Sequence, residues 1–154
     1  MPKLALDIRV EASLAETWDA YFDPRLWGSW VDGFQTQVER SPGYPAEVGS
    51  ALVWRSIPAG RGTVRERVLA HEERRLHRIA FADPAMEGEL ETRFAIEGSG
   101  TRVRQEMSYR LLDRGPISRL GALLFVKAQI RSSMERSLAA FKHEAQEIAS
   151  LEAG

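Results

Sequence analysis

The strongest constraint on this sequence is a change of hydrophobic period near residue 115. From Phe34 to Asp113 apolar and polar residues alternate, and after Gly115-Pro116 the apolar residues recur every three or four positions. A period of two is typical of strands with one buried face, and a period near 3.6 is typical of an amphipathic helix. Together with an alternating segment at the start of the chain, this pattern predicts strands near 3–10, 34–40, 48–56, 61–71, 75–82, 87–97 and 102–112.

The alternation also assigns residues to the two faces of the sheet. In an antiparallel hairpin, side chains that pair across the strands share a face. A turn centred on Ser99-Gly100 would pair Thr92 with Met107, and a turn centred on Pro84-Ala85 would pair His77 with Thr92. The opposite face collects Arg and Glu, which we expect to neutralise one another in solvent. The dry face collects the apolar residues Val64, Val68, Ile79, Phe81, Leu90, Phe94, Ile96, Val103, Met107 and Leu111.

Three helices are expected around this sheet. Ser13 to Glu16 fits a capping box, and Asp23-Pro24 suits the start of a second short helix. A third helix should run from Gly115-Pro116 to about Ile148, roughly 50 Å at 1.5 Å per residue. The order β-α-α-β6-α predicts an α+β fold in one domain, 1–154, with about seven antiparallel strands. The inward stripe of the long helix comprises Leu120, Leu123, Ile130, Met134, Leu138, Phe141, Ala145 and Ile148.

Composition and charge narrow the classes of function. Among 154 residues, 21 basic and 22 acidic side chains leave a net charge of −1, so we expect no nucleic-acid partner. There is no cysteine, and the three histidines are widely spaced, so we expect no metal site and no cofactor. The longest apolar run, Leu120 to Val126, is far too short to span a membrane, and the N-terminus lacks a signal-peptide core. We therefore expect a cytoplasmic protein without membrane insertion.

Several short motifs occur in an order that resembles a known superfamily. They are Trp18, Asp23-Pro24, Trp27 and Trp30, then Val48-Gly49-Ser50, then Gly98-Ser99-Gly100-Thr101-Arg102-Val103, and finally Phe141-Lys142-His143-Glu144. Across residues 3–148 the chain resembles the START-like, birch-allergen-like (SRPBCC) superfamily, and within it the polyketide cyclase/dehydrase group. The resemblance implies a helix-grip fold, in which a curved sheet wraps around the long helix and encloses a hydrophobic cavity. The family has no shared catalytic triad, so no catalytic residue is transferred.

Polar residues on the dry face are the candidates for a binding site. Burying Glu, His and Gln together without partners costs about 1–3 kcal/mol each or more, whereas a ligand cavity requires a few such groups. The alternative is that they lie at strand ends or satisfy one another. Thr36 is assigned to the same face, on a strand that no tight hairpin holds in register. The predicted ligand-binding set is Trp54, Glu66, His77, Thr92, Phe94, Gln105, Met107, Tyr109, Lys127, Ile130 and Met134.

Five of the singled-out residues carry specific hypotheses. His77 is a candidate general acid or base, with Tyr109 as a hydrogen-bond donor and Glu66 on a neighbouring strand, although a structural histidine is the simpler explanation. Lys127 falls on the inward stripe, where it would meet an acidic ligand group at the cavity mouth, unless it extends out to water. Phe125 falls outside the stripe, and an exposed apolar patch there would favour a homodimer.

Three functions stay open from the sequence. The first is a carrier or sensor that binds a small hydrophobic molecule of lipid, polyketide or aromatic type. The second is an enzyme of the polyketide cyclase/dehydratase type that uses His77 and Tyr109. The third is a protein-interaction module without a small ligand.

Overall fold

A computed structural model describes residues 1–112 and 119–153, without the side chains of residues 119–123. The predictions for Leu120 and Leu123 therefore lie outside the described side chains, and the predicted helix start at Gly115-Pro116 lies outside the described residues. Seven antiparallel strands form one sheet in the order β1-β7-β6-β5-β4-β3-β2. The strands are β1 (Lys3–Val10), β2 (Phe34–Arg40), β3 (Ala51–Ser56), β4 (Thr63–Glu72), β5 (Leu76–Ala82), β6 (Met86–Glu97) and β7 (Gly100–Leu111).

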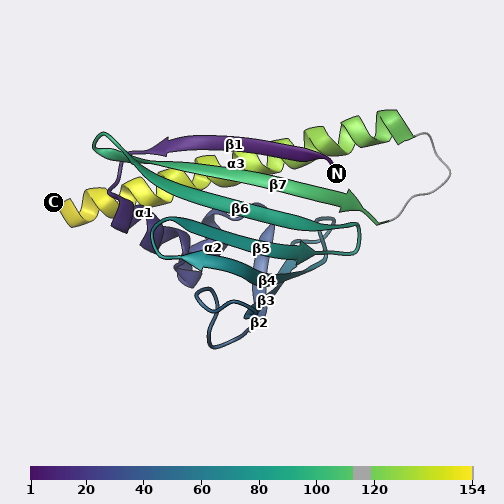
Figure 1. Ribbon diagram of the computed structural model, residues 1–154, viewed down its shortest axis with the longest axis horizontal. Helices are drawn as coiled ribbons and strands as arrows, with labels where there is room; N and C mark the ends of the chain where they lie inside the picture. Colours follow the sequence, from purple (N-terminus) through teal and green to yellow (C-terminus); the bar gives the residue numbers. More distant parts are fainter. Residues whose placement is uncertain (113–118, 154) are drawn as a thin grey trace.

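The helices cover one face of this curved sheet, as the predicted α+β helix-grip architecture requires (Figure 1). They are α1 (Leu14–Tyr21), the 3-10 turn η1 (Pro24–Leu26), α2 (Trp27–Trp30) and α3 (Arg119–Ala153). The capping box is confirmed, because Ser13 Oγ accepts from Glu16 N–H at 3.1 Å while the Glu16 carboxylate accepts from Ser13 N–H at 2.9 Å. None of the helices in the described part of the chain is both long and apolar enough to cross a bilayer.

The strand registers confirm the assignment of faces and correct one hairpin. The pairing of His77 with Thr92 is confirmed. In the β6–β7 hairpin, however, Thr92 pairs with Gln105 rather than with Met107, because the turn lies one residue earlier than predicted. The pairing moves by two residues, which leaves every side chain on its predicted face.

Two residues assigned to the dry face are exposed instead. Ile96 is 71 % exposed, although Thr101, its partner across the β6–β7 hairpin, is fully buried. Thr36 is exposed because β2 is an edge strand whose pairing with β3 shifts register twice. Most of the remaining apolar residues belong to two clusters, one around Trp18, Phe94 and Phe141 and one around Leu4, Phe81, Met107, Tyr109, Ile130 and Met134.

The charged face of the sheet carries the expected ladder of ion pairs. Arg102 bonds both Asp7, at 2.8 Å, and Glu97, at 2.7 Å, and further pairs join Arg110 to Glu87 and Arg93 to Glu91. These arginines are therefore already paired with carboxylates from the same sheet.

Candidate functional site

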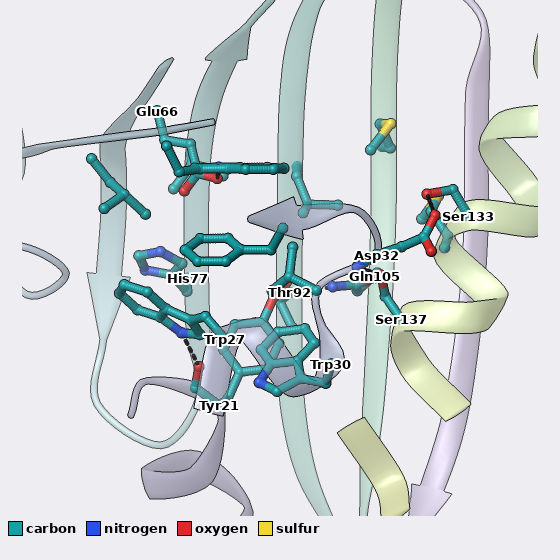
Figure 2. A pocket seen from close by; sticks show the side chains of 18 of the residues that line it. Tyr21, Trp27, Trp30, Asp32, Glu66, His77, Thr92, Gln105, Ser133 and Ser137 are labelled. Carbon is teal, nitrogen blue, oxygen red and sulfur yellow. Dashed lines mark hydrogen bonds between the residues drawn. The ribbon is translucent and has the colours of Figure 1, made fainter. Parts of the chain in front are cut away.

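A cavity of about 140 Å³ lies between the sheet and the helices that cover it. The strands β3 to β7 form its floor, the segment from Tyr21 to Phe34 closes one side, and α3 contributes Ser133, Met134 and Ser137. Figure 2 shows side chains from these elements pointing into the same space. Three tryptophans, Trp27, Trp30 and Trp54, line it.

A row of neutral polar side chains crosses the cavity floor. Thr92 on β6 pairs with Gln105 on β7, and both meet the buried Tyr21 hydroxyl from α1. Gln105 Nε2 donates to Tyr21 Oη at 3.0 Å, and Tyr21 Oη also bonds Thr92 Oγ1 at 3.0 Å. Burial raises the pKa of Tyr21 to about 12, so this phenol stays protonated at physiological pH. We name Tyr21, Thr92 and Gln105 the neutral wall.

A buried carboxylate stands on the neighbouring part of the floor. Glu66 on β4 accepts from the Tyr44 hydroxyl at 2.8 Å and from Trp54 Nε1 at 2.9 Å. Burial raises the pKa of Glu66, although these two hydrogen bonds and the positive charge of Arg61 act in the opposite direction. Arg61 also lines the cavity, and its Nε donates to the buried Asp83 at 2.8 Å. The carboxylate is thus oriented by two donors from different segments.

A histidine pair joins the cavity to its surroundings. His77 on β5 is 4 % exposed, and its Nδ1 lies 3.0 Å from Nδ1 of the half-buried His71 on β4. A β-bulge between Val68 and Ala70 adds one residue to β4, so His71 faces the same side as His77 instead of the charged face. Burial lowers the pKa of His77 to about 3, with His71 as a second cause, so His77 is neutral at pH 7. We name Glu66, His71 and His77 the ionisable wall.

At the other end of the cavity, the loop after α2 is bonded to α3. The Asp32 carboxylate accepts from Ser133 Oγ at 2.8 Å and from Arg136 at 3.0 Å, and Asp32 N–H donates to Ser137 Oγ at 2.9 Å. Arg136 and Ser133 lower the pKa of Asp32. This rim ties the segment that closes the cavity to the long helix.

The structure brings most of the predicted site residues together, and whether they contact a ligand stays a prediction. Phe94 instead packs against Trp18 and Tyr21, with ring centroids 4.9 and 5.3 Å apart. Tyr109 and Ile130 belong to the second apolar cluster but do not line the cavity, and Lys127 is exposed and outside the lining, as in the alternative that its side chain extends out to water. The predicted residues that do line the cavity are Trp54, Glu66, His77, Thr92, Gln105, Met107 and Met134.

Sequence reasoning missed several polar residues of the site. Tyr44 and Asp32 lie in irregular segments, where no period indicates which way a side chain points. Ser133 and Ser137 are four residues apart on α3 beside the inward stripe, and this spacing was a usable signal. The part of the chain that the structure describes contains no group of three or more His, Asp or Glu arranged to hold a metal ion.

Comparison with known families agrees with this architecture. The family described as "Polyketide cyclase / dehydrase and lipid transport" matches residues 1–146. The chain belongs to this family. No curated protein matches the sequence. The cyclase/dehydrase resemblance seen in the sequence is thereby confirmed.

Solved structures share the fold of this family member at low sequence identity. The Zhui aromatase/cyclase from a Streptomyces species has a TM-score of 0.75 and 15 % identity, with 94 % of this chain and 93 % of that chain covered. A START superfamily protein from Mycobacterium smegmatis has a TM-score of 0.74 and 12 % identity, with 95 % and 98 % covered. Norcoclaurine synthase from Thalictrum flavum, in complex with dopamine and hydroxybenzaldehyde, has a TM-score of 0.69 and 14 % identity, with 95 % and 87 % covered. These similarities concern the fold.

Proposed function

We propose that this protein binds a small hydrophobic molecule about the size of one aromatic ring, with polar substituents, in the cavity between the sheet and α3. The observation that carries the proposal is an aromatic-lined cavity into which Glu66, His77 and Gln105 face. Each of these groups already bonds a neighbour within the protein, which holds it in a fixed orientation toward the cavity. A carboxylate, an imidazole and an amide each keep further donor or acceptor sites with which they would bond a ligand.

The size of the cavity supports a small ligand. A cavity of about 150 Å³ is known to hold benzene, whereas pockets for drug-sized ligands span roughly 300–1,000 Å³. The 140 Å³ found here matches the first case. The two compounds named with the Thalictrum flavum norcoclaurine synthase, dopamine and hydroxybenzaldehyde, each contain one aromatic ring.

The geometry favours binding as a carrier or sensor over a reaction that uses His77 and Tyr109. Tyr109 packs in the second apolar cluster, outside the cavity lining, so the two side chains do not face one ligand. With a pKa of about 3, His77 is an uncharged imidazole at neutral pH and lacks the second ring proton that a general acid would donate. It remains suited to hydrogen-bond a bound molecule.

Binding is tested with probes of graded size. We expect phenol and 4-hydroxybenzaldehyde to bind with one-to-one stoichiometry in calorimetry and to change the emission of the lining tryptophans. Dodecanoic acid, which is far larger than the cavity, should bind more weakly than either. Failure of the one-ring probes to bind the wild-type protein would overturn the proposal.

A matched pair of variants locates the binding. Leu90→Phe adds volume beside the cavity, which Leu90 lines, and should abolish binding of the one-ring probes. Ile96→Phe makes a similar change on the same strand at an exposed position and should leave binding unchanged. Thermal unfolding of both variants checks that they fold. Equal binding by the two variants would place the probes outside the cavity.

A further inference from the structure

The contact between His71 and His77 restricts where protons can lie. Their Nδ1 atoms are 3.0 Å apart, the distance of a hydrogen bond. An imidazole nitrogen that carries a proton only donates, and one without a proton only accepts. One of the two Nδ1 atoms therefore carries a proton and the other does not.

When the pair is neutral, this rule leaves two arrangements. If His71 Nδ1 donates, His77 carries its own proton on Nε2 and offers a donor. If His77 Nδ1 donates, its Nε2 is bare and offers an acceptor. His77 lines the cavity, and the described part of the chain supplies no hydrogen-bond partner for its Nε2. Nε2 is thus the atom that a bound molecule would meet.

When the pair takes up one proton, only one arrangement remains. Three protons then occupy four nitrogens, and one of the three still lies between the two Nδ1 atoms. Both Nε2 atoms must carry the other two, whichever ring holds the positive charge. The Nε2 atom of His77 can then only donate.

We propose that His71 and His77 form a shared-proton pair through which proton uptake fixes the hydrogen-bonding polarity of the cavity. The unprotonated pair accepts from or donates to a ligand, and the protonated pair only donates. The inference rests on the proposed binding function and adds a ligand preference that depends on pH: ligands with hydrogen-bond acceptors, such as aryl carbonyls, gain affinity on acidification.

The surroundings of the pair determine how readily it takes up the proton. His71 is half-buried, so its outer side reaches solvent, while His77 lies behind it. Burial lowers the pKa of His71 below 6.5, and the nearby Glu73 acts against this decrease. The aromatic rings of Trp18 and Phe22 pack on the pair, with ring centroids 4.8 to 5.4 Å from those of the imidazoles. Other ionisable groups at the cavity are Tyr21, Asp32, Tyr44, Arg61 and Glu66.

Two ring probes that do not titrate between pH 4.5 and 7.5 test the ligand preference. Benzaldehyde only accepts hydrogen bonds, and pyrrole only donates one. From pH 7.5 to pH 4.5 we expect the affinity for benzaldehyde to rise and that for pyrrole to fall, each about three- to tenfold, the effect of one hydrogen bond. Affinities that change in the same direction, or not at all, would overturn the inference.

Variants show whether the pair is responsible. His71→Phe removes the partner nitrogen, so both pH trends should disappear, because no shared proton then sets which His77 nitrogen is protonated and burial still lowers the pKa of His77. His71→Gln keeps a polar side chain that does not titrate, so both pH trends should disappear in it as well. This second variant tests the inference even if His71→Phe fails to fold. His143→Gln alters an exposed histidine of α3 beside Glu147 and should leave both trends as in the wild type. Trends that persist without His71 would overturn the inference.

Nitrogen NMR of the free protein tests the pair without any ligand. At pH 7.5, long-range ¹H–¹⁵N spectra should show one protonated and one bare Nδ1 for His71 and His77. Protonation of both Nδ1 atoms, or of neither, would overturn the inference while leaving the binding proposal intact. If neither probe binds at either pH, the binding proposal fails, and these spectra decide whether the shared proton exists.

Discussion

The two walls of the cavity satisfy their buried polar groups in different ways. On the neutral wall, Tyr21, Thr92 and Gln105 bond one another at 3.0 Å and hold no charge at physiological pH. On the ionisable wall, burial shifts the pKa of Glu66 upward and that of both histidines downward. In each case burial favours the uncharged form of the side chain.

The difference teaches which part of the cavity responds to its environment. A closed network of hydroxyl and amide groups contributes the same free energy of folding at every pH between the extremes. Groups with shifted pKa values make stability and binding depend on pH. The neutral wall therefore acts as fixed structure, and the ionisable wall is where pH should alter the protein.

The largest effect is expected when the neutral wall is broken. Tyr21→Phe removes the hydroxyl that Gln105 Nε2 and Thr92 Oγ1 share, leaving buried groups without that partner. We expect the free energy of unfolding in urea to fall by about 1–3 kcal/mol, equally at pH 5 and pH 8. Thr36→Val, which removes an exposed hydroxyl, is the control and should change it by less than about 0.5 kcal/mol. A loss no greater than that of the control would mean that the network contributes little.

The ionisable wall should behave differently when Glu66 is neutralised. The folded-state pKa of Glu66 is raised above the unfolded-state value of 4.5. The wild type therefore loses stability as the pH rises from 4.5 through the folded-state pKa, and this carboxyl group costs no stability below pH 4.5. Glu66→Gln lacks this loss. Relative to wild type, the variant should gain stability between pH 4 and pH 8, by about 1.4 kcal/mol per unit of pKa shift.

A surface carboxylate, Glu97, should change stability with pH in the opposite direction to Glu66. Arg102 lowers the pKa of Glu97, so its contribution is present above the unfolded-state pKa and is lost as the pH falls. Glu97→Gln should therefore lose stability relative to wild type as the pH rises from 3 to 6. Unfolding at a series of pH values measures both variants. Parallel curves for Glu66→Gln and wild type would show that the Glu66 carboxylate is not penalised by burial.

Asp32, at the rim, differs from Glu66 because its ionised carboxylate is paired with Arg136 and Ser133. Its folded-state pKa is lowered by Arg136 and Ser133, so it stabilises the protein above the unfolded-state value of 3.8 and loses this effect as the pH falls through the folded-state value. Asp32→Asn should lower the free energy of unfolding at pH 7 by at most about 1 kcal/mol, the range of partly exposed ion pairs. The gap to wild type should narrow below pH 4. A gap that widens on acidification would contradict this assignment.

The smallest effect is expected on the charged face, away from both walls. Arg104 lies 3.5 Å from Asp7, and both side chains are about half exposed. Arg104→Ala should change the free energy of unfolding by less than about 0.5 kcal/mol, because solvent and salt screen such pairs. Chemical denaturation at low and high salt measures this. A larger loss would show that the ladder of ion pairs contributes to stability as a network.

Face assignment could be predicted from the sequence because it depends only on parity along each strand. The β6–β7 register was wrong by two residues, yet His77, Thr92 and Gln105 still lie on one face, because a shift of two keeps odd and even positions on their sides. The capping box at Ser13 was also predictable, since its two hydrogen bonds join residues three positions apart.

The composition of the cavity was decided only by tertiary structure. One extra residue in β4 reverses parity and brings His71 beside His77, and alternation in the sequence does not reveal a bulge. Met107 and Tyr109 lie on the same face and in the same apolar cluster, but only Met107 lines the cavity. The sequence by itself therefore determined the strands, the helices and the buried face, which follow from local periodicity. Which buried side chains border the cavity depends on where α3 and the segment from Tyr21 to Phe34 leave the sheet uncovered, and contacts between distant residues set that position.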